Sequence, residues 1–211
     1  MAVQLLENWL LKEQGKIQTK YRHLNQVSVV EPDILFIGDS IVEYYPLQEL
    51  FGNAKTIVNR GIRGYQTGLL LENLDAHLYG GAVDKIVLLI GTNDMGKDVP
   101  VNEALNNLEA IIQSIARDYP LTEMKLLSIL PVNEGEEYKQ TVYIRTNEKI
   151  QKWNQAYQEL ASAYMQVEFV PVFDSLTDQA GQLKKDYTTD GLHLSVTGYQ
   201  VLTKALKDYL L

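Results

Sequence analysis

The segment Asp33-Ile34-Leu35-Phe36-Ile37-Gly38-Asp39-Ser40 decides the fold that the sequence predicts. Its four consecutive apolar residues are typical of a strand buried on both faces of a sheet. Gly38 then permits backbone angles that other residues adopt only at a cost, so we expect a sharp turn at the end of this strand. Such a turn places Ser40 at the carboxyl edge of the sheet, where open α/β folds bind their ligands. Ser40 is therefore a candidate nucleophile, provided that a base and an oxyanion site lie nearby.

Four more short apolar runs follow, and helical patterns lie between them. The runs predict strands over residues 56–59, 85–90, 124–130 and 167–173. The apolar spacing predicts helices over residues 67–78, 101–118 and 142–165, and a last helix that Ser195 or Thr197 caps and that ends at Leu210. Because strands that alternate with helices form parallel sheets with right-handed crossovers, we predict a flavodoxin-like three-layer α/β/α fold with a five-stranded parallel sheet.

The N-terminal segment differs from this alternating pattern. Apolar residues recur at roughly helical spacing over residues 3–24, among many Gln, Lys and Glu, so we expect one amphipathic helix, or two if Gly15 interrupts it. A chain of 211 residues suits one domain, and no linker or repeat divides it. We therefore expect a single domain over residues 1–211, on which residues 1–30 pack as a helical extension unless they join two subunits in a homodimer.

The composition argues against several kinds of partner. With 19 basic and 27 acidic residues, the formal net charge is -8, which disfavours nucleic acid and anionic lipid. The absence of cysteine excludes thiolate catalysis, disulfides and Cys-ligated metals. The N-terminus is too polar for a signal peptide, and no stretch approaches the roughly 20 apolar residues that span a bilayer. We expect a cytoplasmic protein without stable membrane insertion.

A serine hydroxyl becomes a good nucleophile only when a base, usually histidine, takes its proton. The chain has three histidines. His23 lies in the polar N-terminal segment and His77 lies late in a predicted helix, whereas His193 lies in the loop after the last strand, at the edge where Ser40 emerges. Asp190 precedes it by three residues, so one tight turn can bring the carboxylate to Nδ1 and leave Nε2 facing the serine. Taken alone, the tetrapeptide from Asp190 to His193 is more often a surface turn with an incidental Asp–His pair.

Other residues could stabilise an oxyanion at the same edge. Asn93 lies in the Gly-Thr-Asn-Asp segment that ends the strand predicted over residues 85–90, and its side-chain amide could donate a hydrogen bond there. The backbone N–H groups of Gly64 and Ser40 could do the same. Each residue alone also has a structural interpretation, since Asn93 could cap a helix and Gly64 could open one. Their joint order, each just past a separate predicted strand, favours one shared site.

With these motifs together, the chain resembles the SGNH (GDSL-type) hydrolases. Four blocks carry the resemblance: Phe36-Ile37-Gly38-Asp39-Ser40-Ile41, Asn59-Arg60-Gly61-Ile62-Arg63-Gly64-Tyr65-Gln66-Thr67, Gly91-Thr92-Asn93-Asp94 and Asp190-Gly191-Leu192-His193-Leu194-Ser195. Their spacing is similar to that of the branch containing the platelet-activating-factor acetylhydrolase catalytic subunits. The resemblance runs from about Ile34 to the C-terminus, so the N-terminal helical segment lies outside it.

The resemblance implies a catalytic triad in which Ser40 is the nucleophile, His193 the base and Asp190 its partner. It also implies an oxyanion hole formed by Gly64, Asn93 and the backbone amide of Ser40. The chain lacks the Gly-x-Ser-x-Gly elbow that carries the nucleophile in α/β-hydrolases, which sets it apart from those serine enzymes.

Within the second block we choose Gly64 over Gly61, because the family's donor glycine stands just before the block's usual Asp-Thr. This chain has Tyr65 at the following position, so we expect Tyr65 to alter the acyl pocket. Residues that follow the nucleophile closely could line the site or pack in the core: Tyr44, Tyr45 and Leu47. Of these, we expect Tyr44 to contact the substrate together with Tyr65.

The implied reaction is acyl transfer to water, which needs no metal or organic cofactor. A metal site built on Asp39, Asp94, Asp190 and His193 is disfavoured because it would contain one imidazole only. We assign Asp39 and Asp94 to turn geometry and hydrogen bonding. The favoured hypothesis is a serine esterase with an open, shallow pocket for small-molecule esters with short acyl groups, including O-acetylated sugars or lipids. A lysophospholipase or thioesterase acting on longer chains is the alternative, and a non-catalytic ligand-binding module is the third hypothesis.

Overall fold

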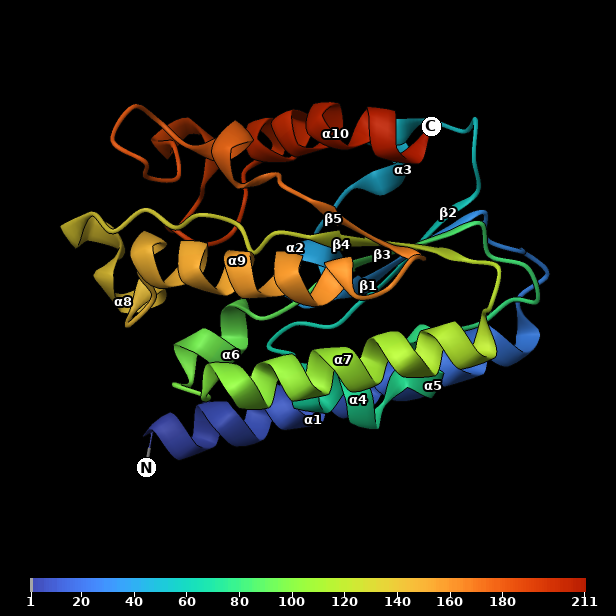
Figure 1. The fold of residues 1–211 in the computed structure, drawn as a ribbon. Coiled ribbons are helices and arrows are strands. Elements are labelled where there is room, and N and C mark those ends of the chain that lie inside the picture. The colour runs from blue at the N-terminus through green and yellow to red at the C-terminus, as the bar shows by residue number, and fades with distance from the viewer. Residues whose placement is uncertain (1) are drawn as a thin grey trace.

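The computed structural model describes residues 2–211, and side chains from residue 8 onward. Five parallel strands form one sheet in the order β2-β1-β3-β4-β5 (Figure 1). The strands are β1 (Ile34–Gly38), β2 (Ile57–Gly61), β3 (Lys85–Leu89), β4 (Glu123–Leu127) and β5 (Val167–Val170). This order is that of flavodoxin-like, doubly wound sheets, so the predicted fold class is confirmed.

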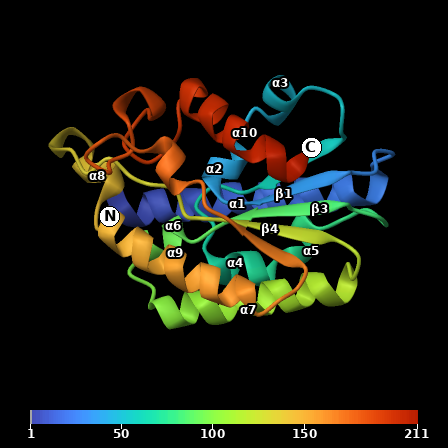
Figure 2. The same ribbon diagram turned by 45° about the horizontal axis from the view of Figure 1, so that its top comes forward.

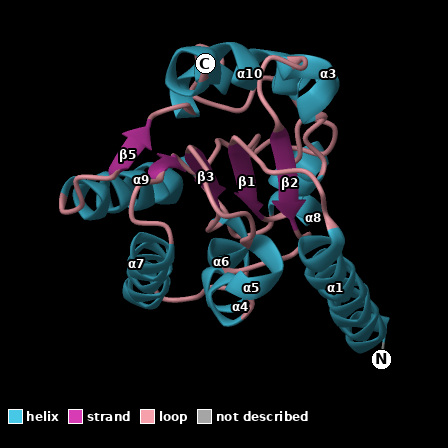
Figure 3. Ribbon diagram, turned by 90° about the vertical axis from the view of Figure 1, so that its right-hand side faces the viewer, coloured by secondary structure: helices cyan, strands magenta, loops and turns pink. Residues whose placement is uncertain are grey.

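Helices cover both faces of the sheet (Figure 3). One layer contains α1 (Ala2–Val27), α4 (Thr67–Glu72), α5 (Leu74–His77), α7 (Val101–Asp118) and α9 (Asn147–Ser162), and the other contains α3 (Leu47–Phe51) and α10 (Val196–Leu210). Short helices follow the carboxyl ends of the strands: α2 (Ser40–Glu43), α6 (Thr92–Gly96) and α8 (Lys139–Val142). None of the described helices has both the length and the apolar character that a membrane span requires.

Each face of the sheet packs its own apolar core, because successive side chains of a strand point to opposite faces. On β1, Leu35 and Ile37 join the core beneath α1, α4, α5, α7 and α9. Ile34 and Phe36 join the core beneath α3 and α10. All four side chains are at most 1% exposed. The apolar run before Ser40 thus fills both cores, and this burial fixes the strand that delivers the serine to the sheet edge.

Helix α1 runs without a break through Gly15, so the alternative of two N-terminal helices is wrong. One interior glycine costs a helix only about 1 kcal/mol, which contacts along its length can offset. The Tyr21 hydroxyl donates to the Gly61 carbonyl at 3.0 Å, and Arg22 pairs with Asp75 of α5 at 2.6 Å. The N-terminal end of α1 lies at the same end of the molecule as α6 and α8 (Figures 1 and 2). The helix therefore packs on its own chain and extends to the carboxyl edge of the sheet.

The structure corrects the predicted start of one helix and identifies the cap of another. The helix predicted over residues 142–165 begins only at α9, where Thr146 accepts a hydrogen bond from the backbone three residues later. Tyr143, at a φ of +57°, separates α9 from the short α8, so helical spacing alone placed the start too early. At the other helix, Ser195 rather than Thr197 is the cap of α10.

Candidate active site

The register of the sheet brings three loops to the same place. Gly38, the last residue of β1, pairs with the last residues of β2 and β3. Ser40, Gly64 and Asn93 follow these strand ends by two, three and four residues. The candidate nucleophile and the two candidate oxyanion residues therefore lie just past three adjacent strand ends, at the carboxyl edge of the sheet.

A tight turn after β1 presents the nucleophile. A Cβ on Gly38 would lie 2.0 Å from the Leu89 carbonyl oxygen, so only glycine allows the two strands to approach this closely. Asp39 then caps α2, because its Oδ1 accepts a hydrogen bond from the Ile41 backbone N–H at 2.9 Å. The helix begins at Ser40 itself, which is 6% exposed. The serine is thus held between a strand end and a helix start.

The three residues of the implied triad form a hydrogen-bonded chain. Ser40 Oγ lies 2.9 Å from His193 Nε2, and His193 Nδ1 lies 2.8 Å from Asp190 Oδ2. Asp190 Oδ1 accepts the backbone N–H groups of Leu192 and His193 at 3.1 and 2.8 Å. Burial alone would raise the pKa of Asp190, but hydrogen bonds from the His193 side chain and from these backbone groups lower its pKa to about 2. The carboxylate is therefore ionised at neutral pH and can hold the ring proton on Nδ1.

Three candidate N–H donors follow the ends of β1, β2 and β3. Gly64 has a φ of +72°, in the left-handed region that favours glycine. Within the described part of the chain, neither its backbone N–H nor that of Ser40 donates a hydrogen bond. Asn93 Nδ2 donates one hydrogen to the Tyr65 carbonyl at 3.0 Å, and its second amide hydrogen has no acceptor among the described residues. These groups have the donor types that stabilise an oxyanion.

Arg145 contacts the start of α6, where Asn93 lies, and is a residue that the sequence patterns did not predict. Its Nη2 lies 3.5 Å from Asn93 Oδ1, and its Nε donates to the Thr92 carbonyl at 2.8 Å. The residue is buried, and its Nη1 donates to the Val142 carbonyl at 3.2 Å. Burial lowers its pKa, an effect that nearby Asp39 opposes. An arginine in a polar loop belongs to no motif, so no pattern in the sequence indicated it.

The two buried aspartates make the contacts of capping residues. Asp94 accepts the Thr67 backbone N–H at 3.1 and 3.0 Å and the Thr67 hydroxyl at 2.5 Å, at the start of α4. Burial raises the pKa of Asp94. Asp39 is 1% exposed, and its Oδ2 has no hydrogen-bond partner among the described residues. Burial raises the pKa of Asp39 to about 7.

The two tyrosines expected at the substrate lie in different environments. Tyr44 is 45% exposed, and its ring centroid lies 5.6 Å from that of His193, at the edge of the site. Tyr65 is fully buried, and its hydroxyl accepts a hydrogen bond from Gln18 of α1 at 2.5 Å. The Tyr65 side chain is therefore not accessible to a substrate, contrary to the expectation from the sequence. The other two candidates for the wall of the site are core residues: Tyr45 and Leu47.

The remaining histidines lie away from the serine. His77 is fully buried on α5, its Nδ1 lies 2.6 Å from the Arg60 carbonyl oxygen, and burial lowers its pKa to about 4. His23 belongs to α1. Among the residues that the structure describes, no group of three His, Cys, Asp or Glu side chains could hold a metal ion.

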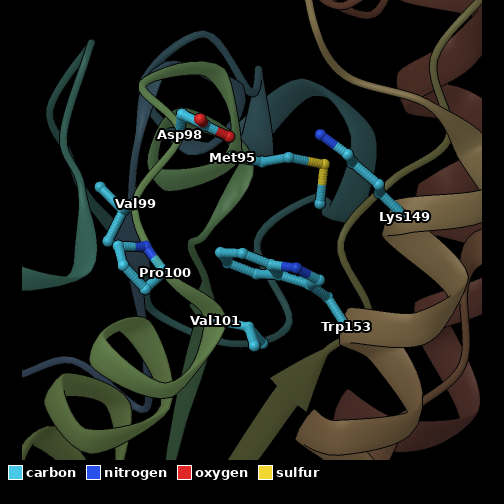
Figure 4. A pocket seen from close by; sticks show the side chains of 7 residues that line it. All are labelled: Met95, Asp98, Val99, Pro100, Val101, Lys149 and Trp153. Atoms are coloured by element: carbon cyan, nitrogen blue, oxygen red, sulfur yellow. The ribbon is translucent and has the colours of Figure 1, made fainter.

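A cavity of about 240 Å³ lies beside α6, between the starts of α7 and α9 (Figure 4). Its lining residues are Met95, Asp98, Val99, Pro100, Val101, Lys149 and Trp153. Met95 stands two residues after Asn93, and residues two apart on a helix face different sides. The cavity therefore opens on the side of α6 that is turned away from the Asn93 amide.

A serine, a histidine and an aspartate in a hydrogen-bonded chain at the edge of a parallel sheet are the arrangement of a serine hydrolase. The model of the GDSL-like Lipase/Acylhydrolase family matches residues 36–201, and the chain belongs to this family. It is an enzyme, a serine hydrolase that acts on carboxylic ester bonds.

Known proteins similar to this chain agree with that family. A solved structure from Streptococcus pneumoniae, described as a platelet activating factor, is 89% identical, with a TM-score of 0.99 over 100% of this chain and 99% of that chain. Platelet-activating factor acetylhydrolase IB subunit alpha2 of Rattus norvegicus is 28% identical over 186 residues, which are 86% of this chain and 77% of that protein. Axe2, an acetylxylan esterase from Geobacillus stearothermophilus, is 18% identical with a TM-score of 0.67, over 85% of this chain and 94% of that chain, and shows the fold alone.

Proposed function

We propose that the enzyme hydrolyses short-chain esters of the acetyl type through an acyl-enzyme on Ser40, with His193 as the base and Asp190 as its partner. The observation that carries this proposal is the hydrogen-bonded chain from Ser40 Oγ to His193 at 2.9 Å and from His193 to Asp190 at 2.8 Å. An imidazole that a carboxylate orients toward a serine is the arrangement that activates the hydroxyl. An acetylhydrolase among the curated relatives supports acetyl esters as substrates.

In the acylation step, Ser40 Oγ attacks the ester carbonyl carbon while its proton moves to His193 Nε2. The electron pair of the C=O double bond moves onto the carbonyl oxygen. As the tetrahedral intermediate collapses, the bond to the alcohol breaks and His193 returns the proton to the leaving alkoxide. Water then repeats both steps on the acyl-enzyme, releasing the carboxylic acid and restoring the serine. Asp190 stays ionised and stabilises the imidazolium that forms in each half of the reaction.

The N–H groups of Gly64, Ser40 and Asn93 would stabilise the negative charge on the carbonyl oxygen by donating hydrogen bonds to it. They follow the ends of three adjacent strands that are in register. Backbone donors held by a sheet edge need little rearrangement when the charge develops, which is the basis of oxyanion stabilisation. Removing one such donor typically lowers kcat by about 10²- to 10³-fold.

The residues that follow the serine divide between the core and the edge of the site. Ile41 and Val42, which directly follow it, are 1% exposed and belong to the core. Tyr44 is the exposed aromatic residue beside His193, so we place it on the wall of the site and assign no such role to Tyr65.

The alternative, a lysophospholipase or thioesterase for longer chains, rests on the cavity of about 240 Å³ beside α6. Its apolar side chains include those of Met95, Val99 and Trp153. A long acyl chain on Ser40 would have to pass around α6 to reach it, because the cavity is not lined by Ser40, Asn93 or His193. This detour makes the short-chain substrate the better-supported proposal.

Hydrolysis of p-nitrophenyl esters from acetate to palmitate tests both versions. We expect kcat/KM to be highest for acetate or propionate and to decrease with chain length, and Ser40→Ala to abolish turnover. A maximum at octanoate or longer would favour the alternative. Turnover that persists in Ser40→Ala, or no turnover by the unmodified protein, would contradict the proposal. The homodimer stays a prediction, which sedimentation equilibrium can check.

A further inference from the structure

The loop between β2 and α4 carries Gly64 and is held by side chains from distant elements. Glu43 of α2 accepts the backbone N–H of Arg63 at 2.6 Å. Gln14 of α1 donates from Nε2 to the backbone carbonyl of Arg63 at 2.9 Å. The peptide unit before Gly64 is therefore hydrogen-bonded to the N-terminal helix. This helix lies outside the residues that the family model matches.

The carbonyl that Gln14 binds and the N–H of Gly64 belong to the same peptide unit. A trans peptide is planar, and its C=O and N–H point in opposite directions. Fixing the Arg63 carbonyl oxygen therefore fixes the direction of the Gly64 N–H. This restraint matters at a glycine, because glycine adopts φ values of either sign at similar cost and its peptide units turn easily. The hydrogen bond also polarises the peptide in the direction that strengthens its N–H as a donor.

The contact between α1 and this loop is close and buried. Gln14 is 3% exposed, although it belongs to a helix rich in polar residues. A Cβ built on Gly64 would lie 2.9 Å from Gln14 Nε2 and 3.0 Å from Leu10 Cδ2. A buried amide needs a hydrogen-bond partner, and Gln14 finds it in the Arg63 carbonyl. Two turns of α1 thus pack directly against the candidate oxyanion glycine.

From these contacts we propose that Gln14 is a positioning residue that aims the Gly64 N–H at the oxyanion, which makes α1 part of the active site. Its role depends on the proposed function, since the oxyanion forms only if Ser40 attacks an ester. Gln14 acts through the Arg63–Gly64 peptide, so it should affect the transition state and leave binding of the neutral ester unchanged.

The docking of α1 does not depend on Gln14 alone. Further along the helix, Tyr21 donates to the Gly61 carbonyl at 3.0 Å, and Arg22 pairs with Asp75 at 2.6 Å. Removing the Gln14 amide should therefore leave the helix in place while freeing the Arg63–Gly64 peptide. This separation lets an experiment distinguish positioning from a general structural role.

The test compares Gln14→Met with Gln18→Met. Both changes remove a side-chain amide from the same helix one turn apart, but Gln18 donates to the Tyr65 hydroxyl and not to the peptide before Gly64. Each variant is assayed for kcat and KM with p-nitrophenyl acetate and for inhibition by a short trifluoromethyl ketone, which forms a tetrahedral oxyanion adduct with a reactive serine. Thermal unfolding of both variants is measured in parallel.

We expect Gln14→Met to lower kcat about tenfold, less than full loss of a donor, and to raise the inhibition constant of the ketone by a similar factor. KM should change by less than about twofold, and Gln18→Met should change none of the three values by more than that. Equal effects of the two variants, or an unchanged kcat in Gln14→Met, would overturn the positioning role.

Should Gln14→Met fail to fold, Gln14→Glu keeps the shape of the side chain and can donate to the carbonyl only when protonated. Its kcat relative to the unmodified enzyme should fall as pH rises, and a ratio independent of pH would count against the proposal. Ser40→Ala separates the two levels of failure. Turnover that persists in Ser40→Ala contradicts the proposed function. Turnover that depends on Ser40 but has the same kcat in the Gln14 variants contradicts only the role of Gln14.

Discussion

The two sides of the candidate active site are held together in different ways. On the triad side, Asp190 contacts the ring of His193, three residues later, and accepts the backbone N–H groups of Leu192 and His193. On the oxyanion side, the Gly64 loop is held by Gln14, 49 residues from its acceptor, and Arg145 contacts Asn93 from 52 residues away. The triad's acid–base pair is thus a local turn, whereas the oxyanion donors depend on contacts across the fold.

This difference predicts how each side responds to change. A local turn keeps its geometry as long as its own few residues remain, so substitutions elsewhere should leave the acid–base pair intact. Donors that are aimed by α1 and by the loop before α9 should be sensitive to substitutions far from the serine. The following predictions test this contrast, beginning with the largest expected effect.

If the triad acts as a unit, Ser40→Ala and His193→Ala should each lower kcat by about 10⁴-fold or more, and the double variant should be hardly worse. The reason is that neither residue contributes to proton transfer without the other. Steady-state kinetics with p-nitrophenyl acetate measures all three variants. Losses that multiply in the double variant would show that the two residues do not share a mechanism.

Asn93→Ala should lower kcat by about 10²-fold with little change in KM, because it removes an oxyanion donor. The fold should persist, as circular dichroism can verify. Asn73→Ala is the matched control, because it removes another asparagine amide, which donates to the Leu69 carbonyl at 2.9 Å on the α4–α5 segment. This control should keep kcat within about twofold. An unaffected kcat in Asn93→Ala would remove this residue from the oxyanion hole.

The buried Asp39 predicts a pH-dependent stability. Burial raises its pKa to about 7, an effect that nearby His193 and Arg145 oppose and Asp94 reinforces, so the folded state keeps a proton that the unfolded state releases above pH 4. Its contribution to stability is therefore full below pH 4 and is lost as pH rises through about 7.

Asp39→Asn keeps an oxygen for the N–H of Ile41 but cannot ionise. Relative to the unmodified protein, it should gain about 2 kcal/mol in the free energy of unfolding between pH 5 and pH 8. Urea unfolding at both pH values measures this difference. The same difference at both values would mean that the carboxyl is already ionised at pH 5.

The smallest effect is expected at Tyr44, whose half-exposed ring lies beside His193. Tyr44→Leu should raise KM about two- to fivefold and leave kcat nearly unchanged, because a wall of the site binds ester and transition state alike. Tyr164→Leu, at the opposite edge of the sheet before β5, should change neither value. A large fall in kcat in Tyr44→Leu would instead indicate that the ring positions His193.

The sequence predicted the parts of this molecule that local patterns encode. The apolar runs identified the strands because parallel strands buried on both faces are mostly apolar, and Asp190 could be paired with His193 because three residues make one turn. Helix starts were less accurate, since helical spacing continued through Tyr143 although its backbone leaves the helical region.

Contacts between distant segments could not be predicted in this way. Tyr65 was expected at the substrate from its place beside Gly64, but Gln18 of α1 covers it in the core. Gln14 and Arg145 lie in stretches of ordinary composition, and only the folded chain brings them to the oxyanion side. A single sequence contains no signal for pairs so far apart.

Labelling with a fluorophosphonate tests the central claim, that His193 activates Ser40, most directly. Intact-mass spectrometry and peptide mapping should show one phosphonyl adduct per chain, on Ser40, and His193→Ala should slow its formation by at least about 10³-fold. An adduct on another residue, or labelling of Ser40 at the same rate in His193→Ala, would contradict the account.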